Sequence, residues 1–197
     1  MNQNQLTGIE SLQIIQQMIQ AAKDEHRDSG QGWLVWGWLL FTTSVASAVL
    51  MQLDLNRYIG YVWMSMLFVG FIIYAIIHFT TKKKEKVRTY VQVLLDRIGA
   101  GFYISLITMV AASFLTESNF SFGYYYILYA FWMYIYGSAL KFKPLMIGAF
   151  VNWIAAIAIF LIEDFYYDMV VSALAILIGY LVPGHILRYE YRRKMNL

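Results

Sequence analysis

The chain has no cysteine, only two prolines and few charged residues. Without cysteine it can form no disulfide, no thiolate metal site and no cysteine nucleophile. Two prolines in 197 residues leave no proline-rich linker. Charged residues make up 14% of the chain, whereas a typical soluble domain has about a quarter. This shortage of charge indicates that most of the chain lies in lipid.

Hydrophobic residues are abundant instead, at 60% of the chain. Six windows lack Asp, Glu, Lys and Arg and approach or exceed the roughly 20 apolar residues that a membrane-spanning helix needs. We therefore predict an all-α polytopic membrane protein, with six transmembrane helices in three hairpins and a cytoplasmic N-terminal amphipathic helix. Residues 1–30 form the cytoplasmic helical region, and residues 31–197 form the transmembrane domain. The predicted spans cover about residues 33–53, 58–80, 98–116, 122–140, 144–162 and 169–187.

The distribution of Lys and Arg predicts the orientation. Basic residues precede the first span, fill the loop "TKKKEKVR" after the second, flank the loop after the fourth and follow the sixth. With six spans all of these fall on one side of the membrane, and only Arg57 falls on the other. Basic loops mark the cytoplasmic side, so we expect both termini to be cytoplasmic. Because the bias recurs at every inner loop, we interpret "TKKKEKVR" as a topology signal and expect no direct contact with nucleic acid.

The interior of the predicted spans holds no Asp, Glu, Lys or Arg. Ionisable groups at that depth mark proton relays, ion pathways and voltage sensors. Their absence argues against a proton-coupled carrier, a pump and a voltage-gated channel. The GxSxG, HExxH and Walker patterns are also absent. We therefore predict a protein that is not an enzyme and that uses no cofactor and no metal ion.

Residues 7–28, "TGIESLQIIQQMIQAAKDEHRD", form an amphipathic helix in pattern but are too polar to span a membrane. Thr7 and Glu10 have the spacing of a capping box at its start. The apolar face at helical spacing consists of Leu12, Ile15, Met18, Ile19 and Ala22. Glutamine rather than Lys or Arg covers the other face, which argues against a helix on anionic lipid. We expect this leader helix to make protein contacts, with its own chain or a second copy first and a soluble cytoplasmic partner second.

Small residues form two stripes at helical spacing. One runs along the third span at Gly101, Ser105, Thr108 and Ala112, and the other along the sixth at Ser172, Ala175 and Gly179. Such stripes bring transmembrane helices into close contact. They predict that these two spans form either the tightly packed centre of the protein or a dimer seam.

Asn152 is the most polar group deep in a predicted span, and Trp153 follows it directly. A hydrogen bond to a neighbouring helix is the simpler interpretation. The alternative is an intramembrane pocket formed by Tyr134, Asn152 and Trp153. The fourth span is richer in tyrosine than an interfacial belt requires, which predicts that its middle faces protein or a cavity.

Four segments, "ESLQIIQQMIQAAKDE", "GWLVWGW", "KFKPLMIG" and "YLVPGHIL", resemble a group of uncharacterised bacterial six-helix integral membrane proteins with an amphipathic leader helix. The resemblance covers most of the chain, but its motifs are structural. It implies a location in the bacterial inner membrane and no activity, substrate or cofactor. Such proteins accompany small winged-helix regulators, which implies a sensory or regulatory role.

We therefore predict an interaction or regulatory module that acts through its leader helix and basic loop, as a homodimer in contact with membrane lipid. The alternative is a small transporter, channel or lipid-binding protein for a neutral or apolar ligand. A cavity in the middle of the helices that touches Asn152 and Tyr134 would favour this alternative. The residue pattern identifies neither the ligand nor the partner.

Overall fold

The computed structural model describes residues 29–81, 90–116, 121–162 and 164–195. The leader helix, with its face of Leu12, Ile15, Met18, Ile19 and Ala22, lies outside the described residues, as does most of the basic loop. The described residues are almost entirely helical and contain no strand. Their helical elements are α2 (Gln31–Gln52), η1 (Asn56–Tyr58), α3 (Ile59–Thr81), α4 (Tyr90–Thr116), α5 (Gly123–Ala139), α6 (Lys143–Leu161), α7 (Phe165–Ile176), η3 (Leu177–Leu181) and α8 (Val182–Met195).

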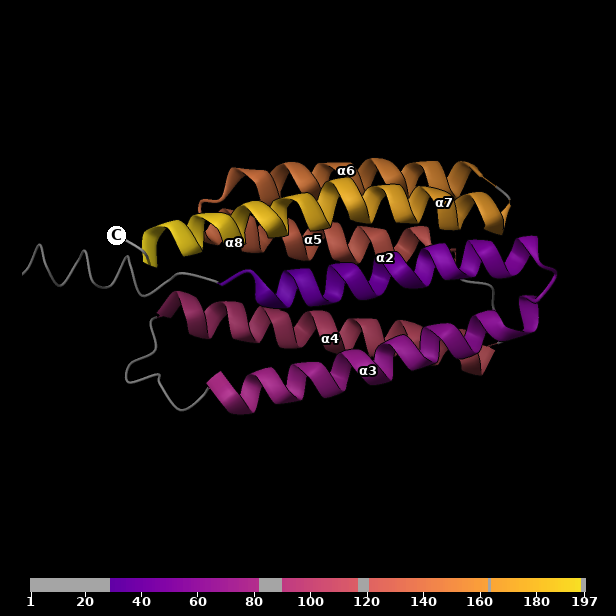
Figure 1. The fold of residues 1–197 in the computed structure, drawn as a ribbon, viewed down its shortest axis with the longest axis horizontal. Helices are drawn as coiled ribbons and strands as arrows, with labels where there is room; N and C mark the ends of the chain where they lie inside the picture. Colours follow the sequence, from indigo (N-terminus) through magenta and orange to yellow (C-terminus); the bar gives the residue numbers. More distant parts are fainter. Residues whose placement is uncertain (1–28, 82–89, 117–120, 163, 196–197) are drawn as a thin grey trace, which may run out of the picture.

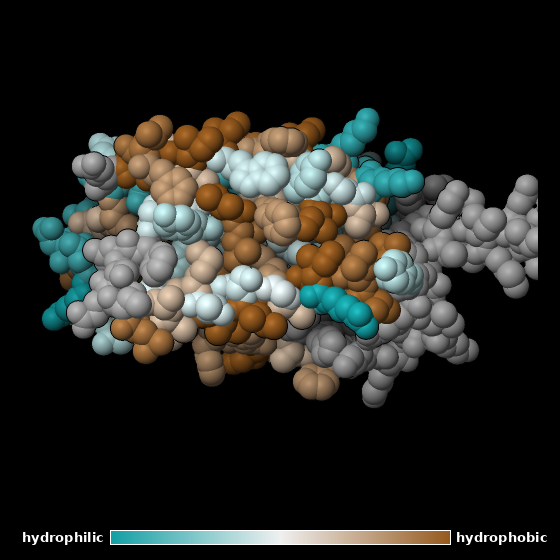
Figure 2. All heavy atoms as spheres, turned by 180° about the vertical axis from the view of Figure 1, so that it is seen from behind, coloured by the Kyte–Doolittle hydropathy of each residue, from teal (hydrophilic) through white to brown (hydrophobic). Residues whose placement is uncertain are grey.

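Five helical stretches in the described part are long and apolar enough to cross a membrane. They are Gln31–Gln52, Asn56–Ile73, Val93–Ser113, Lys143–Leu161 and Phe165–Arg193. The prediction of an all-α protein with several membrane-spanning helices is thus confirmed for these residues. Figure 2 shows the matching surface, with hydrophobic and weakly polar residues over the middle of the body and the most hydrophilic residues mainly at its two ends.

The helices form a packed bundle with two looser helices beside it (Figure 1). The bundle consists of α2, α5, α6 and the continuous arm made by α7, η3 and α8, which we call the α7–α8 arm. Of the two outer helices, α3 packs on α2 and α4 packs on α5. Among the described residues, the backbones of α3 and α4 do not come into close contact. The fold therefore leaves room between the bundle and this outer pair.

Short-range hydrogen bonds explain where several helices begin and end. The Asp164 side chain accepts a hydrogen bond from the backbone N–H of Tyr166 at 2.8 Å, and so caps the start of α7. At the end of α5 the N–H of Lys141 bonds to the carbonyl of Ser138, and that of Phe142 to the carbonyl of Gly137. This is a Schellman motif, in which Lys141 takes the left-handed conformation (φ 54°) more often adopted by glycine. The chain then turns directly into α6.

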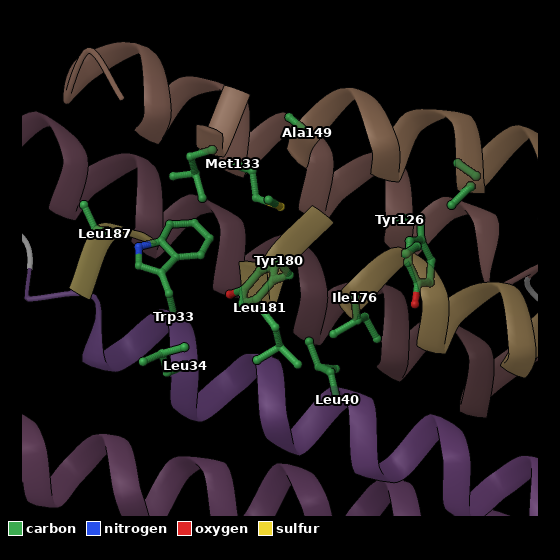
Figure 3. Packing of buried hydrophobic residues seen from close by; sticks show 14 of the residues in the cluster. Trp33, Leu34, Leu40, Tyr126, Met133, Ala149, Ile176, Tyr180, Leu181 and Leu187 are labelled. Atoms are coloured by element: carbon green, nitrogen blue, oxygen red, sulfur yellow. The ribbon is translucent and has the colours of Figure 1, made fainter. Parts of the chain in front are cut away.

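Aromatic rings fill the bundle beside the α7–α8 arm (Figure 3). Trp33 of α2 is almost completely buried, and its ring lies 5.2 Å from that of Tyr136 and 5.0 Å from that of Tyr180. Met133 of α5 and Leu181 of the arm are also buried in this cluster. The cluster therefore joins α2, α5 and the arm into one packed unit.

The closest approach of two helices is between α6 and the α7–α8 arm. A Cβ atom added at Gly148 would overlap the carbonyl oxygen of Gly179, so the two backbones touch there. Pro183 has no N–H and cannot bond to this carbonyl, four residues earlier. The arm instead forms a π-helical turn, in which the N–H of Val182 bonds to the carbonyl of Leu177. The arm has no sharp kink at Pro183 and continues as α8 (Figure 1).

Candidate functional site

A cavity of about 330 Å³ lies between the packed bundle and the outer helices α3 and α4. Every long helix of the described part contributes to its wall. The lining residues are Leu40, Gly60, Trp63, Met64, Met66, Leu67, Leu106, Val110, Ser113, Phe122, Tyr125, Tyr126, Tyr129, Asn152, Ile176 and Tyr180. A space of this size is at the lower end of the range of small-molecule sites.

The wall of the cavity is apolar and aromatic and carries no charged residue among those described. Two of its residues on α3 are exposed: Gly60 and Met64, the latter at 51%. The cavity therefore reaches the outer surface of the molecule beside α3, on the side where the backbones of α3 and α4 do not come into close contact. In a membrane this surface faces hydrocarbon, so a molecule dissolved in the bilayer has a direct path into the cavity.

Asn152 is the polar side chain at the inner wall, halfway along α6 and only 2% exposed. Its Nδ2 donates to the carbonyl oxygen of Gly148 at 2.8 Å and lies 3.5 Å from the sulfur of Met133. These contacts use the amide N–H groups and fix which atom is the oxygen. Among the described residues, nothing donates a hydrogen bond to the Asn152 oxygen. The inner wall of the cavity thus has an acceptor to which no described residue donates.

A second polar point lies on the α4 and α5 side of the cavity. The Ser113 hydroxyl donates to the carbonyl oxygen of Met109 at 2.9 Å, which uses its only proton. The hydroxyl oxygens of Ser113 and Tyr125 are 3.3 Å apart, so Tyr125 is the donor of this pair. The Tyr125 oxygen then remains able to accept. Asn152 and Tyr125 thus both present an acceptor to the cavity.

The π-helical turn of the arm borders the same space. Ile176 and Tyr180, on either side of its centre, line the cavity, while Gly179 packs against α6. A Cβ added at Gly179 would lie 2.6 Å from Nδ2 of Asn152 and 2.9 Å from the carbonyl oxygen of Gly148. Single π turns occur often at functional sites because they place an irregular backbone beside a ligand. Here the turn brings the arm against the one buried amide of the cavity wall.

The residues of the predicted pocket separate in the structure. Asn152 lines the cavity, but Tyr134 and Trp153 are not among its lining residues. Their rings pack against each other at 5.6 Å, and both contact the exposed Phe150. Asparagine and tryptophan at adjacent positions point about 100° apart on a helix, so they face different surroundings.

The cavity also contains residues that the sequence analysis did not single out. Tyr125, Tyr126 and Tyr129 come from the tyrosine-rich helix α5, whose unusual composition was the available signal. Trp63 comes from α3, and nothing in the local pattern distinguishes it from an aromatic residue at a membrane interface. Its Nε1 is buried and has no hydrogen-bond partner among the described residues.

The two small-residue stripes also differ in their surroundings. Ser172, Ala175 and Gly179 are buried in the bundle. On α4, Gly101, Ser105 and Thr108 are exposed and Ala112 is partly buried. The stripe of the arm thus lies in the packed centre, whereas the stripe of α4 lies on the outer surface.

The described residues contain no group of three or more His, Asp or Glu side chains that could hold a metal ion. Asp164, at the start of α7, caps the helix instead. The site that the geometry offers is therefore an apolar cavity with acceptors at Asn152 and Tyr125 and an indole N–H donor at Trp63. No family model, curated protein or solved structure matches the chain.

Proposed function

We propose that the chain is an integral membrane protein that binds a neutral, largely apolar ligand in the cavity between its bundle and helices α3 and α4. The observation that carries the proposal is the cavity itself, about 330 Å³ in volume and lined by apolar and aromatic residues around Asn152. A fully packed bundle would have served an assembly or scaffold role better. Ligand sites in helical proteins commonly lie between helices in this way.

The character of the wall supports a neutral ligand. An ion buried in apolar surroundings needs an opposite charge or several hydrogen bonds, and the lining residues provide no charge. The opening beside Met64 supports access from the bilayer rather than from water. A lipid-binding protein and a carrier for an apolar solute both fit these features.

We also propose six spans with both termini on the cytoplasmic side. The helix that completes the six is α5, whose 17 residues reach about 26 Å at 1.5 Å per residue, close to the thickness of the hydrocarbon core. The pairs α2 with α3, α4 with α5, and α6 with α7 pack side by side, which supports three hairpins. The start of α2, the loop between α5 and α6 and the end of α8 lie at one end of the body (Figure 1), with Lys141, Lys143 and Arg192.

Single cysteines test this topology cleanly because the chain has none of its own. A membrane-impermeant maleimide is expected to label Asn56→Cys in intact cells, because Asn56 lies in the proposed outer loop. The same reagent should label Lys141→Cys only after the membrane is opened. Both positions are exposed, so accessibility within the protein does not differ between them. Labelling of Lys141→Cys in intact cells would mean that α5 does not cross the membrane.

Filling the cavity tests the ligand proposal. Val110 lines the cavity and is partly buried, so Val110→Phe places a larger ring in the space. We expect the purified wild-type chain to carry a neutral lipid-like molecule. The variant should carry at least about tenfold less of it, because the added ring occupies part of the cavity and should weaken binding by more than about 1.4 kcal/mol. Native mass spectrometry from a mild detergent measures the occupancy.

The matched control is Val49→Phe, which adds the same ring to an exposed position of α2 outside the cavity. It should leave the occupancy unchanged. Equal occupancy in Val110→Phe and in the wild type would show that the bound molecules lie on the outer surface and would remove the support for the proposal.

The interaction or regulatory role is the second candidate, with the homodimer that accompanies it. Its leader helix and basic loop lie outside the described residues, so it stays a prediction. The exposed stripe of Gly101, Ser105 and Thr108 is the described surface on which a second copy could pack closely.

A further inference from the structure

We infer that the ligand of the cavity is a neutral single-chain lipid with a hydroxyl group, and that this hydroxyl donates a hydrogen bond to the side-chain oxygen of Asn152. The inference rests on the proposed function and adds the chemical class and orientation of the ligand. It predicts a preference that an apolar cavity without Asn152 would not have.

The hydrogen bonds of Asn152 indicate that the ligand carries a hydroxyl group. The Nδ2 group already has Gly148 and Met133 as partners, and the oxygen has no donor among the described residues. An acceptor that faces an apolar cavity without a donor lacks a hydrogen bond that it would have in water. A ligand hydroxyl removes this cost, whereas an ether, ester or ketone oxygen offers no proton. The inner wall therefore discriminates in favour of a donor.

The second polar point gives the same preference. Ser113 donates its proton to the carbonyl of Met109, and Tyr125 donates its proton to Ser113. The Tyr125 oxygen can therefore only accept a hydrogen bond from the ligand. A ligand with one hydroxyl satisfies the deeper and more buried acceptor first, since Asn152 is less accessible to water than Tyr125. A carboxylate or phosphate would place a negative charge against these acceptors, and no lining residue would neutralise it.

The volume of the cavity limits the enclosed part of the ligand to about one chain. A water molecule occupies about 30 Å³ in the liquid, and a methylene group is of similar size, so 330 Å³ holds on the order of ten methylene groups. A two-chain phospholipid or diacylglycerol exceeds this space. The opening beside Gly60 and Met64 allows the rest of a longer chain to remain in the bilayer.

Two isomers provide the sharpest probes. Undecanol and decyl methyl ether have the same atoms and almost the same length, but only the alcohol has a proton to donate. We expect the intact wild-type chain in detergent to bind undecanol about tenfold more tightly, as one additional hydrogen bond of ordinary strength implies. Titration followed by native mass spectrometry gives the two dissociation constants.

The variants connect the preference to its residue. Asn152→Leu keeps the size of the side chain and removes the deeper acceptor, so the preference for undecanol should fall from about tenfold to the weaker preference that the Tyr125 oxygen provides. Ser44→Ala is the control, because Ser44 is a fully buried polar residue that does not line the cavity and bonds only to the carbonyl of Leu40. This control should keep the tenfold preference.

The possible outcomes test the hydroxyl inference and the proposed function separately. Equal binding of the isomers by the wild type would overturn the hydroxyl inference and leave the apolar ligand site intact. An undiminished tenfold preference in Asn152→Leu would overturn the role of Asn152. Binding of neither isomer by the wild type, together with no ligand in the purified chain, would overturn the proposed function as well. If Asn152→Leu does not fold, the wild-type comparison still decides whether the site prefers a donor.

Discussion

Gly148→Ala is expected to destabilise the protein by about 3 kcal/mol, at the upper end of the range for overpacked interiors. A Cβ atom at this position would overlap the carbonyl oxygen of Gly179, which belongs to a rigid backbone and cannot rotate away as a side chain can. Helix α6 and the α7–α8 arm must therefore separate at the turn η3. That separation also breaks the contact of Gly179 with Asn152. The midpoint of thermal unfolding, followed by tryptophan fluorescence in detergent, measures the loss.

Gly32→Ala is the matched control for this prediction. Gly32 is also a helical glycine, but a Cβ added there meets no atom within 4 Å. Alanine favours the helix over glycine by up to about 1 kcal/mol, so this variant should be unchanged or slightly more stable. If Gly148→Ala were as stable as Gly32→Ala, the close crossing of α6 and the α7–α8 arm would be wrong.

Trp33→Ala is expected to cost a similar amount, again about 3 kcal/mol. The indole is 5% exposed and contacts the rings of Tyr136 and Tyr180, which belong to α5 and the arm. Its removal leaves a void where three helices meet, and Figure 3 shows that the neighbouring side chains come from separate helices. In a membrane the loss is mainly one of packing, so we expect the lower end of the range for tryptophan.

Trp38→Ala, on the same helix, is the matched control. It distinguishes the loss of core packing from the loss of any aromatic residue. Trp38 is 47% exposed, and its ring neighbours among the described residues are Phe41 and His185. Truncation there should cost less than about 1 kcal/mol. Equal losses at the two positions would contradict the assignment of Trp33 to the core. Both variants retain five of the six tryptophans, so the fluorescence readout remains available.

Hydropathy and charge were sufficient to predict the long helices of the described residues, because each of these helices contains a long run of apolar residues. The predicted span 144–162 differs from α6 by one residue at each end. Helix α4 instead begins at Tyr90, well before the predicted span at 98, because "YVQVLLDRIG" continues the helix beyond the apolar window. Length of helix and length of apolar window are thus separate properties, and only the second follows from hydropathy.

The candidate site was harder to predict, because every span is apolar on all sides and gives no periodicity to show which face points inward. Asn152 stands out as a buried amide in any reading of the chain, and the cavity contains it. In the sequence Tyr134 and Trp153 cannot be distinguished from the cavity residues Tyr129 and Trp63. The difference between them lies in the neighbouring helix that each side chain faces. That information lies in the crossing of α6 with the α7–α8 arm and in the separation of α3 from α4, and both are tertiary features.

The π-helical turn places one extra residue in the arm, and this shifts the phase of everything after it. Before the turn, the buried positions Met169, Ser172 and Ile176 follow one another at steps of three and four residues. Within the turn Gly179, Tyr180 and Leu181 are all buried, and Pro183, Gly184 and Leu187 are buried after it. A single residue removed within the turn would rotate α8 by about 100°. The basic end of the chain, with Arg192 and Arg193, would then face a different neighbour, although every residue of the cavity wall before the turn kept its place.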